Sequence, residues 1–336
     1  MREMGITAVA AGLVKTGALL AVVSTLTACA KIELPAHLRP ISKDSMMLLG
    51  KKGMNQHSPI FVRIFKEESE LEIWKQRQDG RFYHFKTYPI CIWSGKLGPK
   101  YKQGDKQAPE GFYTVNRHRM NPNSSYHLAF NLGYPNSFDR SHNRTGNFLM
   151  VHGKCTSAGC YAMTDGLIEE IYALAREAFI GGQQSFEVHA FPFRMTDENM
   201  KRHAKSRHYK FWRTLKQGYD YFELTRKTPS IAVCERRYHV NVAWTGRRPR
   251  ANELCPRFTR PPVEPFWPNL GEEKIANQRI VVPGIKKRKF ARSSSLSRST
   301  LSGLTKAKPK TQKPSASGSG DLIGQLIRLS RPLIGN

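Results

Sequence analysis

The chain has 336 residues and carries 54 Lys and Arg against 26 Asp and Glu, which gives a formal net charge of +28 at pH 7. This length suits one sizeable domain with appendages, or two small domains, and excludes a larger assembly of domains. Such a charge indicates polyanionic partners. Nucleic acid, anionic lipid and an acidic cell-wall polymer all qualify, so the destination of the chain must decide among them.

The N-terminus carries the features of an export signal. Arg2 provides a positive start, and an apolar run from Thr16 to Ala28 follows the last charge, Lys15. The run is too short to span a bilayer comfortably and ends in small residues, as a secretory signal does. A buried apolar helix is the alternative, but its position at Met1 disfavours it. We therefore predict a signal peptide over residues 1–29 and export to the periplasm.

The end of this signal resembles a bacterial lipobox, with the sequence Leu26-Thr27-Ala28-Cys29. Cleavage at a lipobox leaves the cysteine as a lipidated N-terminus, so we expect Cys29 to anchor the protein to the membrane. Ordinary signal cleavage around Ala28 and Ala30 remains open. Export makes nucleic acid an unexpected partner, and we predict none.

Export also places the six cysteines in an oxidising compartment. If Cys29 is lipidated and Cys160 is catalytic, four cysteines remain, and four allow three pairings. A bridge between Cys234 and Cys255 is plausible because it would close a loop rich in Arg and Pro. The sequence leaves the pairing open.

Residues 30–57 look like a spacer, and a strand-rich domain follows over residues 58–225. Short β-branched, aromatic or alternating runs predict its strands, and Asp79-Gly80 is a hairpin signal. A long polar loop with several turn formers spans residues 98–111. The predicted strands are Ile60–Phe65, Leu71–Trp74, Phe82–Tyr88, Phe112–Val115, Tyr126–Leu132, Asn147–Val151 and Ser185–Phe193.

One main helix is predicted after Thr164 and Asp165, which are good N-terminal caps, and it stops at Gly181-Gly182. Its apolar residues recur at helical spacing. Two short helices are expected near residues 197–204 and 209–216. The fold class is α+β, with a mostly antiparallel sheet and one main helix.

The composition changes after residue 225. Residues 226–282 form a basic extension rich in Arg and Pro, and residues 283–336 form a low-complexity basic tail with a short apolar end. Between Glu273 and Asp321 there is no acidic residue. Such a segment buries too little apolar surface to order itself, so we predict that the tail is largely disordered. It serves either as a solvated linker or as a contact to an anionic polymer.

The stretch from His152 to Cys160 contains the candidate catalytic residues. A thiol beside an imidazole can act as a nucleophile, with Cys160 attacking a carbonyl and His152 moving the proton. The helix that follows is expected to lower the pKa of the Cys160 thiol. Gly159 allows a tight turn that points the N–H groups of Gly159 and Cys160 at one oxyanion, and Ser157 caps that turn or donates a further hydrogen bond.

Two other interpretations of the same residues remain open. Cys155 and Cys160 could form a structural disulfide, or His152, Cys155 and Cys160 could ligate zinc, although no fourth ligand follows at a suitable spacing. His127 and His142 are candidates for supporting groups around the site. Our prediction contains no metal.

Several motifs, in order, resemble the YkuD-type L,D-transpeptidases, and in particular their YafK-like murein branch. The resemblance covers about residues 58–225. It is carried by Ser94-Gly95-Lys96-Leu97-Gly98-Pro99-Lys100, Gly104-Asp105, Pro109-Glu110-Gly111-Phe112-Tyr113, Tyr134-Pro135-Asn136, His152-Gly153 and Ser157-Ala158-Gly159-Cys160-Tyr161-Ala162-Met163-Thr164-Asp165.

The resemblance implies a YkuD-like β-sandwich and a cysteine enzyme that needs no cofactor. Cys160 would form a thioester with a peptidoglycan stem peptide at diaminopimelate, His152 would be the base, and the Gly159–Cys160 backbone would hold the oxyanion. Gly153 and Ser157 belong to the same motif. Many members carry a histidine and an arginine where this chain has Ala158 and Ala162, which puts some substrate contacts in doubt.

Three functions therefore follow from the sequence. The first is an L,D-transpeptidase that passes the stem peptide to an amine, for instance on an envelope lipoprotein or an outer-membrane protein. The second is a hydrolase that uses water on the same bonds and releases wall-tethered envelope proteins. The third is a lipid-anchored wall-binding protein whose Cys160 is only structural.

Overall fold

The computed structural model describes residues 33–266, which belong to the first of two compact units, residues 1–286. The signal peptide with Cys29 and the basic tail 283–336 lie outside the described residues, so both stay predictions. Within residues 33–266, none of the helices combines the length and apolar character that crossing a membrane requires.

A five-stranded sheet, sheet A, forms the centre of the domain, with strand order β3-β2-β1-β10-β5. β1 and β10 run parallel, and the other neighbours are antiparallel. The bounds are β1 Ile60–Phe65, β2 Glu70–Gln76, β3 Phe82–Pro89, β5 Gly111–Asn116 and β10 Ser185–Phe191. All five strands were predicted from their apolar patterns.

Both faces of sheet A are buried, which explains why β1 is apolar at almost every position. Ile60, Val62 and Ile64 join one hydrophobic cluster, whereas Phe61 and Phe65 belong to clusters on the opposite face. Successive side chains of a strand point to opposite faces, so a strand covered on both sides needs an apolar residue at each position.

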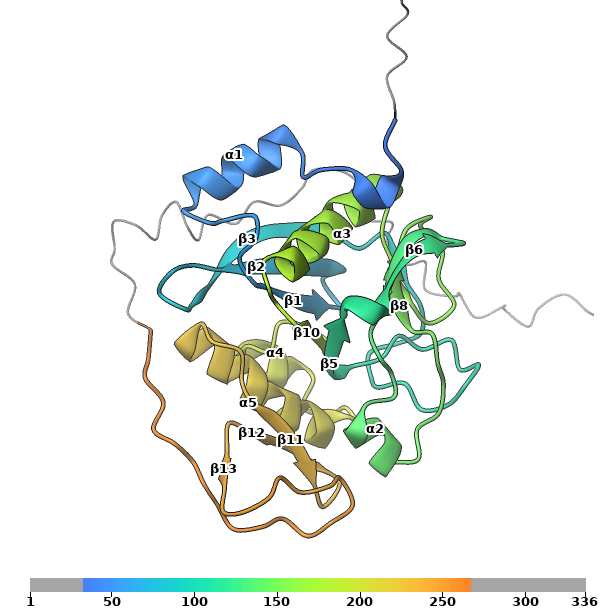
Figure 1. Ribbon diagram of the computed structural model, residues 1–336. Helices are drawn as coiled ribbons and strands as arrows, with labels where there is room; N and C mark the ends of the chain where they lie inside the picture. Colours follow the sequence, from blue (N-terminus) through green and yellow to red (C-terminus); the bar gives the residue numbers. More distant parts are fainter. Residues whose placement is uncertain (1–32, 267–336) are drawn as a thin grey trace, which may run out of the picture. The chain divides into compact units, whose positions relative to one another are not determined.

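Helices cover the two faces of sheet A, as Figure 1 shows, with α3 on one side and α5 on the other. α3 (Asp165–Ile180) is the predicted main helix, with Thr164 and Gly181 at its ends. α5 (Tyr209–Thr225) is just as long, so the prediction of a single main helix was wrong. The expected short helix at 209–216 continues for two more turns because Tyr219 and Phe222 extend its apolar face.

A second five-stranded sheet, sheet B, packs beside the first and has the order β4-β9-β8-β7-β6. One pair, β8 and β9, is parallel, and the remaining pairs are antiparallel. The bounds are β4 Ile92–Trp93, β6 Met120–Ser124, β7 His127–Asn131, β8 Met150–His152 and β9 Tyr161–Ala162. The main core lies between the two sheets and α3. The result is the predicted α+β class, dominated by mostly antiparallel sheets.

The segment expected to be a spacer is partly folded onto the domain. A 3-10 helix, η1 (Ala36–Leu38), and α1 (Lys43–Lys51) precede β1. Leu49 of α1 is buried in the main core, and the Ser45 hydroxyl donates to Glu170 of α3 at 2.5 Å. The spacer interpretation of residues 43–51 was therefore wrong, because this short polar helix relies on contacts with α3 that its own sequence does not reveal.

The extension after α5 also folds onto the domain, at least up to residue 266. Tyr238 of the hairpin packs in a hydrophobic cluster with Phe138 and Trp212. A disulfide joins Cys234 to Cys255, the pairing that the sequence made plausible but left open. The elements are β11 Ile231–Cys234, β12 Arg237–Val240, β13 Ala243–Trp244 and β14 Phe258–Thr259; the remaining short helices of the domain are η2 Arg117–Arg119, α2 Ser137–Ser141 and α4 Asp197–Arg202.

A buried ion pair ties the long polar loop 94–110 to sheet A. Lys66, at the end of β1, donates to Glu110 at 2.9 Å, and both side chains are fully buried. Lys66 also donates to the carbonyls of Lys96, Gly98 and Ala108. The second oxygen of Glu110 accepts from Trp212 at 2.8 Å. The ammonium group of Lys66 therefore holds the loop, and all of its N–H groups donate hydrogen bonds.

We expect Lys66→Met to destabilise the domain by roughly 3–5 kcal/mol, because it leaves the Glu110 carboxylate buried without its counter-ion. Urea unfolding at pH 7 measures this. The control is Lys96→Met, an exposed lysine of the same loop, which should stay within about 0.5 kcal/mol of the unmodified protein. Equal stabilities for the two variants would contradict the assigned role of Lys66.

Candidate active site

Of the two predicted catalytic residues, His152 ends β8 and Cys160 directly precedes β9, the neighbouring parallel strand. The register of sheet B pairs Val151 with Tyr161 and His152 with Ala162. Val151 and Tyr161 point into the main core, so their neighbours in sequence point away from it. By this alternation we infer that His152 and Cys160 face the same side of sheet B.

Residues 153–160 make the crossover between these strands, and backbone hydrogen bonds hold its start. Gly153 N donates to Tyr126 O at 3.0 Å, and Met163 N donates to His152 O at 2.7 Å. A Cβ atom at position 153 would lie 2.5 Å from Oδ1 of Asp165 and 3.0 Å from Tyr126 O. Only glycine fits there, which gives Gly153 of the motif a steric role.

The Ser157 hydroxyl closes the turn before the sulfur. It donates to Cys160 O at 2.7 Å and accepts from Gly159 N at 3.2 Å. Gly159 has φ +137°, a conformation that favours glycine. Because Gly159 N already binds Ser157, the Cys160 N–H is the better candidate for an oxyanion donor.

A disulfide between Cys91 and Cys155 staples the crossover to the start of β4. Cys155 N also donates to Met163 O at 3.1 Å. With Cys155 bonded to Cys91, neither the Cys155–Cys160 disulfide nor the zinc site of His152, Cys155 and Cys160 is formed, and both interpretations were wrong. Cys160 is the one free cysteine within residues 33–266.

His152 is oriented by its own backbone. Its Nδ1 lies 2.7 Å from Gly153 O, and a carbonyl oxygen can only accept, so Nδ1 carries the proton and Nε2 keeps its lone pair. The ring of Tyr126 packs on the imidazole with 4.6 Å between centroids. Burial lowers the pKa of His152, against the smaller opposite effect of the Gly153 carbonyl. The imidazole is therefore neutral at pH 7 and able to accept a proton.

The Cys160 sulfur is partly exposed and has two backbone neighbours. Met150 N donates to Sγ at 3.4 Å, and Phe148 O lies 3.6 Å from it. Burial raises the pKa of the Cys160 thiol, outweighing the Met150 N–H and the charge of Lys100, which favour the thiolate.

The expected lowering of this pKa by a helix was therefore wrong. β9 separates Cys160 from α3, which begins only at Asp165, and the field of a helix end fades within one turn. The resting pair is a neutral thiol beside a neutral imidazole.

Other residues of the site were not singled out from the sequence. Lys100 is buried at the edge of the long loop, held by Asp105 and the Lys102 carbonyl, and its charge acts on Cys160. Phe148 has φ +52° and is 66% exposed, and its carbonyl oxygen lies 3.6 Å from the sulfur. A positive φ at an aromatic residue is a signal that only coordinates reveal.

The supporting histidines have separate places. His127 Nε2 lies 2.6 Å from Glu169, and His127 neighbours Gly153 of the crossover. His142 instead ends α2 and packs on Phe138.

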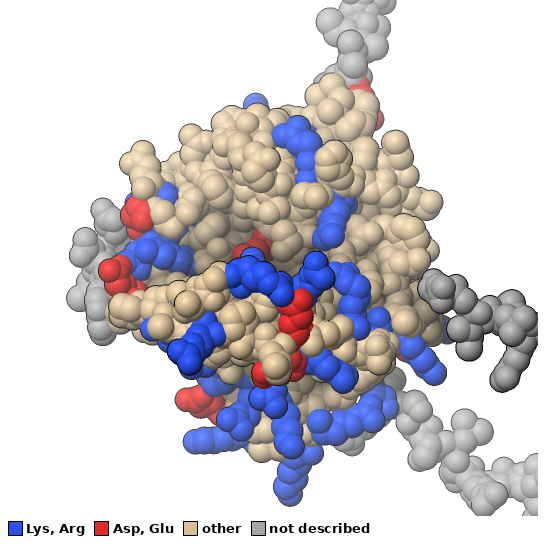
Figure 2. All heavy atoms as spheres, turned by 60° about the horizontal axis from the view of Figure 1, so that its bottom comes forward, with Lys and Arg blue, Asp and Glu red and all other residues tan. Residues whose placement is uncertain are grey.

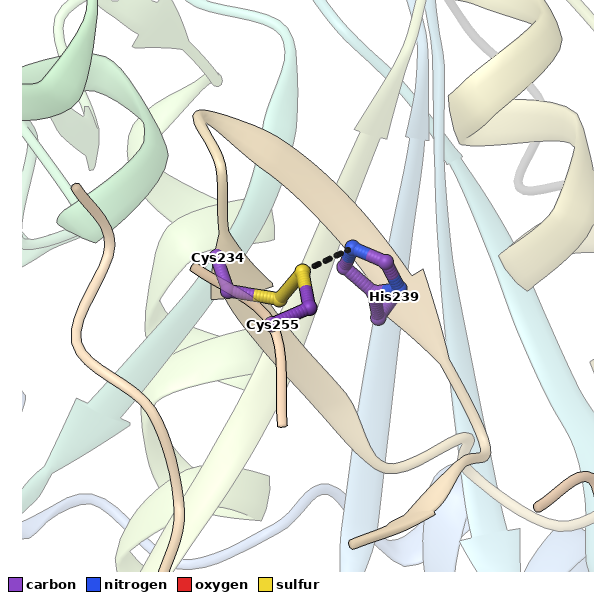
Figure 3. Close-up of side chains that lie close together, drawn as sticks. All are labelled: Cys234, His239 and Cys255. Carbon is purple, nitrogen blue, oxygen red and sulfur yellow. Dashed lines mark hydrogen bonds between the residues drawn. A yellow bond between two sulfur atoms is a disulfide. The ribbon is translucent and has the colours of Figure 1, made fainter. Parts of the chain in front are cut away.

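A separate cluster brings Cys234, His239 and Cys255 together, with their potential ligand atoms within 4.8 Å of one another. Figure 3 shows the two sulfurs bonded to each other and His239 facing Cys255, whose Sγ lies 3.3 Å from Nε2. Zinc binds thiolates, and a disulfide offers none. The cluster is therefore a structural bridge that fastens the C-terminal hairpin.

Residues 60–181 match the YkuD family, described as an L,D-transpeptidase catalytic domain. YafK of Escherichia coli strain K12, which carries the L,D-transpeptidase name provisionally, is 46% identical over 203 residues, covering 60% of this chain and 79% of the relative. YafK of Escherichia coli O157:H7 matches equally well. The chain belongs to the L,D-transpeptidase family, and the resemblance seen in its motifs is confirmed. This family acts on peptidoglycan stem peptides.

Two solved structures show more distant likeness. The helical cell shape determining protein Pgp2 from Campylobacter jejuni is 22% identical, with 44% of this chain and 54% of that one covered, at a TM-score of 0.32. Bd1075 from Bdellovibrio bacteriovorus is 23% identical, with coverages of 56% and 65% and a TM-score of 0.29. The chain thus spans little more than half the length of Pgp2.

We expect alkylation of Cys160 by iodoacetamide to keep accelerating as the pH rises through 9.0, the ordinary thiol pKa, since burial holds the Cys160 pKa above that value. The rate is followed by mass spectrometry of the peptide that contains Cys160. Cys160→Ser is the control and should give no adduct on this peptide. A rate that levels off near neutral pH would indicate a preformed thiolate–imidazolium pair and would contradict the assigned resting state.

Proposed function

We propose that this protein is an exported cysteine L,D-transpeptidase that forms a thioester between Cys160 and a peptidoglycan stem peptide. The observation that supports the proposal best is the register of β8 and β9, from which we infer that His152 and Cys160 face the same side of sheet B. The family match and the absence of a disulfide at Cys160 support it. The localisation rests on the N-terminal sequence alone.

In the first half-reaction, Sγ of Cys160 attacks the carbonyl carbon at the diaminopimelate residue while its proton moves to Nε2 of His152. The carbonyl oxygen becomes an oxyanion, and the Cys160 N–H is placed to stabilise it. The C–N bond to the terminal D-residue then breaks, and the proton passes from His152 to the leaving amine. A thioester remains on Cys160.

In the second half-reaction, an acceptor amine attacks the thioester and loses a proton to His152, and the thiol is restored. The depressed pKa of His152 suits this exchange, because the imidazole returns readily to its neutral form. Water in place of the amine would release the stem peptide, which is the hydrolase alternative. An envelope protein with a free lysine fits the acceptor role.

Two exposed aromatic residues frame the reacting groups. Tyr126, 46% exposed, packs on the His152 imidazole, and the backbone carbonyl of the exposed Phe148 lies 3.6 Å from the sulfur. Ala162, which pairs with His152, replaces the arginine of many family members, and Lys100 is the cation whose charge acts on Cys160. Lys100 thus supplies the positive charge that would favour the developing thiolate.

The decisive experiment incubates the purified protein with disaccharide-tetrapeptide and measures the intact mass. We expect a thioester adduct equal to the donor without its terminal residue, no adduct with Cys160→Ala, and formation slowed roughly 10²- to 10⁴-fold with His152→Ala.

Adding a lysine-bearing acceptor then separates the two outcomes of the thioester. A joined product supports transfer, whereas free stem peptide alone supports hydrolysis. Lack of any adduct, with Cys160 shown to be reduced, would reject both enzymatic functions and leave the wall-binding protein.

We also expect Phe148→Ala to raise KM for the stem peptide about three- to tenfold with a smaller change in kcat. The carbonyl oxygen of Phe148 lies 3.6 Å from the Cys160 sulfur, and its exposed ring can offer apolar contact to a substrate bound there. Steady-state release of the terminal D-residue measures this. Phe148→Tyr keeps the ring and serves as the control. If both variants share one KM, the ring does not contact the substrate.

A further inference from the structure

A large cavity of the described domain lies away from Cys160. It is an open groove of about 1160 Å³ bordered by β5, β10, α2 and the C-terminal extension, and neither His152 nor Cys160 lines it. Its volume exceeds the range of roughly 300–1,000 Å³ that is usual for small-molecule sites, so the groove suits a ligand of several residues.

Four arginines line this groove: Arg119, Arg140, Arg248 and Arg250. Three of them are held by backbone carbonyls instead of carboxylates. Arg119 donates to Thr114 and Leu132, Arg140 to Pro135, and Arg248 to Ile231. Carbonyl partners orient a guanidinium group and leave its charge uncancelled, which is how an anion site is prepared.

The two carboxylates among the lining residues are already engaged. Glu187 lies 2.7 Å from His189. Glu253 lies 3.0 Å from Arg247, which is not part of the groove, and also interacts with Arg250, which is, so the four arginines outnumber the two carboxylates. The groove therefore keeps a positive balance. Figure 2 shows Lys and Arg gathered on the face that carries the C-terminal extension, with a few acidic side chains among them.

β5, the edge strand of sheet A beside the groove, is not free to pair with a further strand at two of its carbonyl groups. Asn136 donates to the carbonyl of Phe112 at 2.8 Å, and Arg119 occupies that of Thr114. A ligand could not pair with these two main-chain groups of β5, so recognition falls to the guanidinium groups and to the apolar side chains of Ile231 and Val233 in the wall.

We propose that this groove is a second binding site, distinct from the thiol site, for carboxylate-bearing peptide stems of polymeric peptidoglycan. The inference rests on the proposed function, since it takes the wall polymer as the substrate. Guanidinium groups bind carboxylates in a two-pronged fashion. Glu187 and Glu253 interrupt the arginines, which suits separate carboxylates on a peptide better than a continuous row of phosphates.

The test measures pelleting of the protein with isolated peptidoglycan, in a Cys160→Ala background so that no turnover occurs. Arg140→Ala with Arg248→Ala removes two groove charges. We expect wall affinity to fall about tenfold. The matched control is Arg213→Ala with Arg237→Ala, two exposed arginines of the same domain that do not line the groove, and it should stay within about twofold.

Peptidoglycan with its carboxyl groups converted to amides provides the second arm. The parent protein should bind the amidated material about tenfold more weakly than untreated peptidoglycan. The groove variant should bind both materials equally, because it already lacks the arginines that would contact the carboxylates. Circular dichroism confirms that all variants are folded.

Equal wall affinity for the groove variant and its control would overturn the proposal, as would a groove variant that still distinguishes the amidated material. Tighter binding of DNA or of anionic vesicles that is lost in the groove variant would overturn the assigned ligand. Thioester formation is measured separately with Cys160 intact, so failure of the proposed function and failure of the groove can be distinguished.

Discussion

The site depends on one tight crossover between two parallel strands. Parallel neighbours usually need a connection of a dozen or more residues, often with a helix. Here residues 153–160 suffice, because β8 and β9 are short and the connection is fixed at several points. The cramped path leaves little freedom for His152 and Cys160, whose arrangement is prepared before any substrate arrives.

The crossover is held by several different kinds of interaction. Gly153 removes a side chain that would collide with Asp165, Ser157 satisfies the polar groups of the turn, and Cys155 is bonded to Cys91. The Lys66–Glu110 pair holds the loop that carries Lys100 toward the sulfur from the other side. The buried ammonium group of Lys66 thus connects sheet A to the loop that carries Lys100.

Local patterns were sufficient for the five strands of sheet A and for α3. β1 and β10 have β-branched and aromatic runs, and α3 begins at Thr164 and ends at Gly181, so period and caps agree with the structure. α1 and α2 escaped prediction because they are short and polar, and tertiary contacts stabilise them. The hairpin β11–β12 was hidden in a segment whose Arg and Pro content suggested an extended chain.

For the site, the sequence indicated candidate residues but not their environment. His152 and Cys160 stand out from their spacing, whereas Cys91, the partner of Cys155, lies 64 positions away. The direction of the Cys160 pKa shift was predicted wrongly because burial is a property of the packed domain, and it outweighs a helix end that is too distant. Phe148 and Lys100 acquire their relevance only from what surrounds them.

The bond between Cys91 and Cys155 also ties the geometry of the crossover to redox conditions. Reduction would cut the covalent tie between β4 and the crossover and return a long segment to the freedom of an open chain. A newly made, still reduced polypeptide would contain His152 and Cys160 but would lack the disulfide that fixes the crossover between them. The crossover would then reach its final geometry only when Cys91 and Cys155 are oxidised, and would lack this constraint where thiols stay reduced.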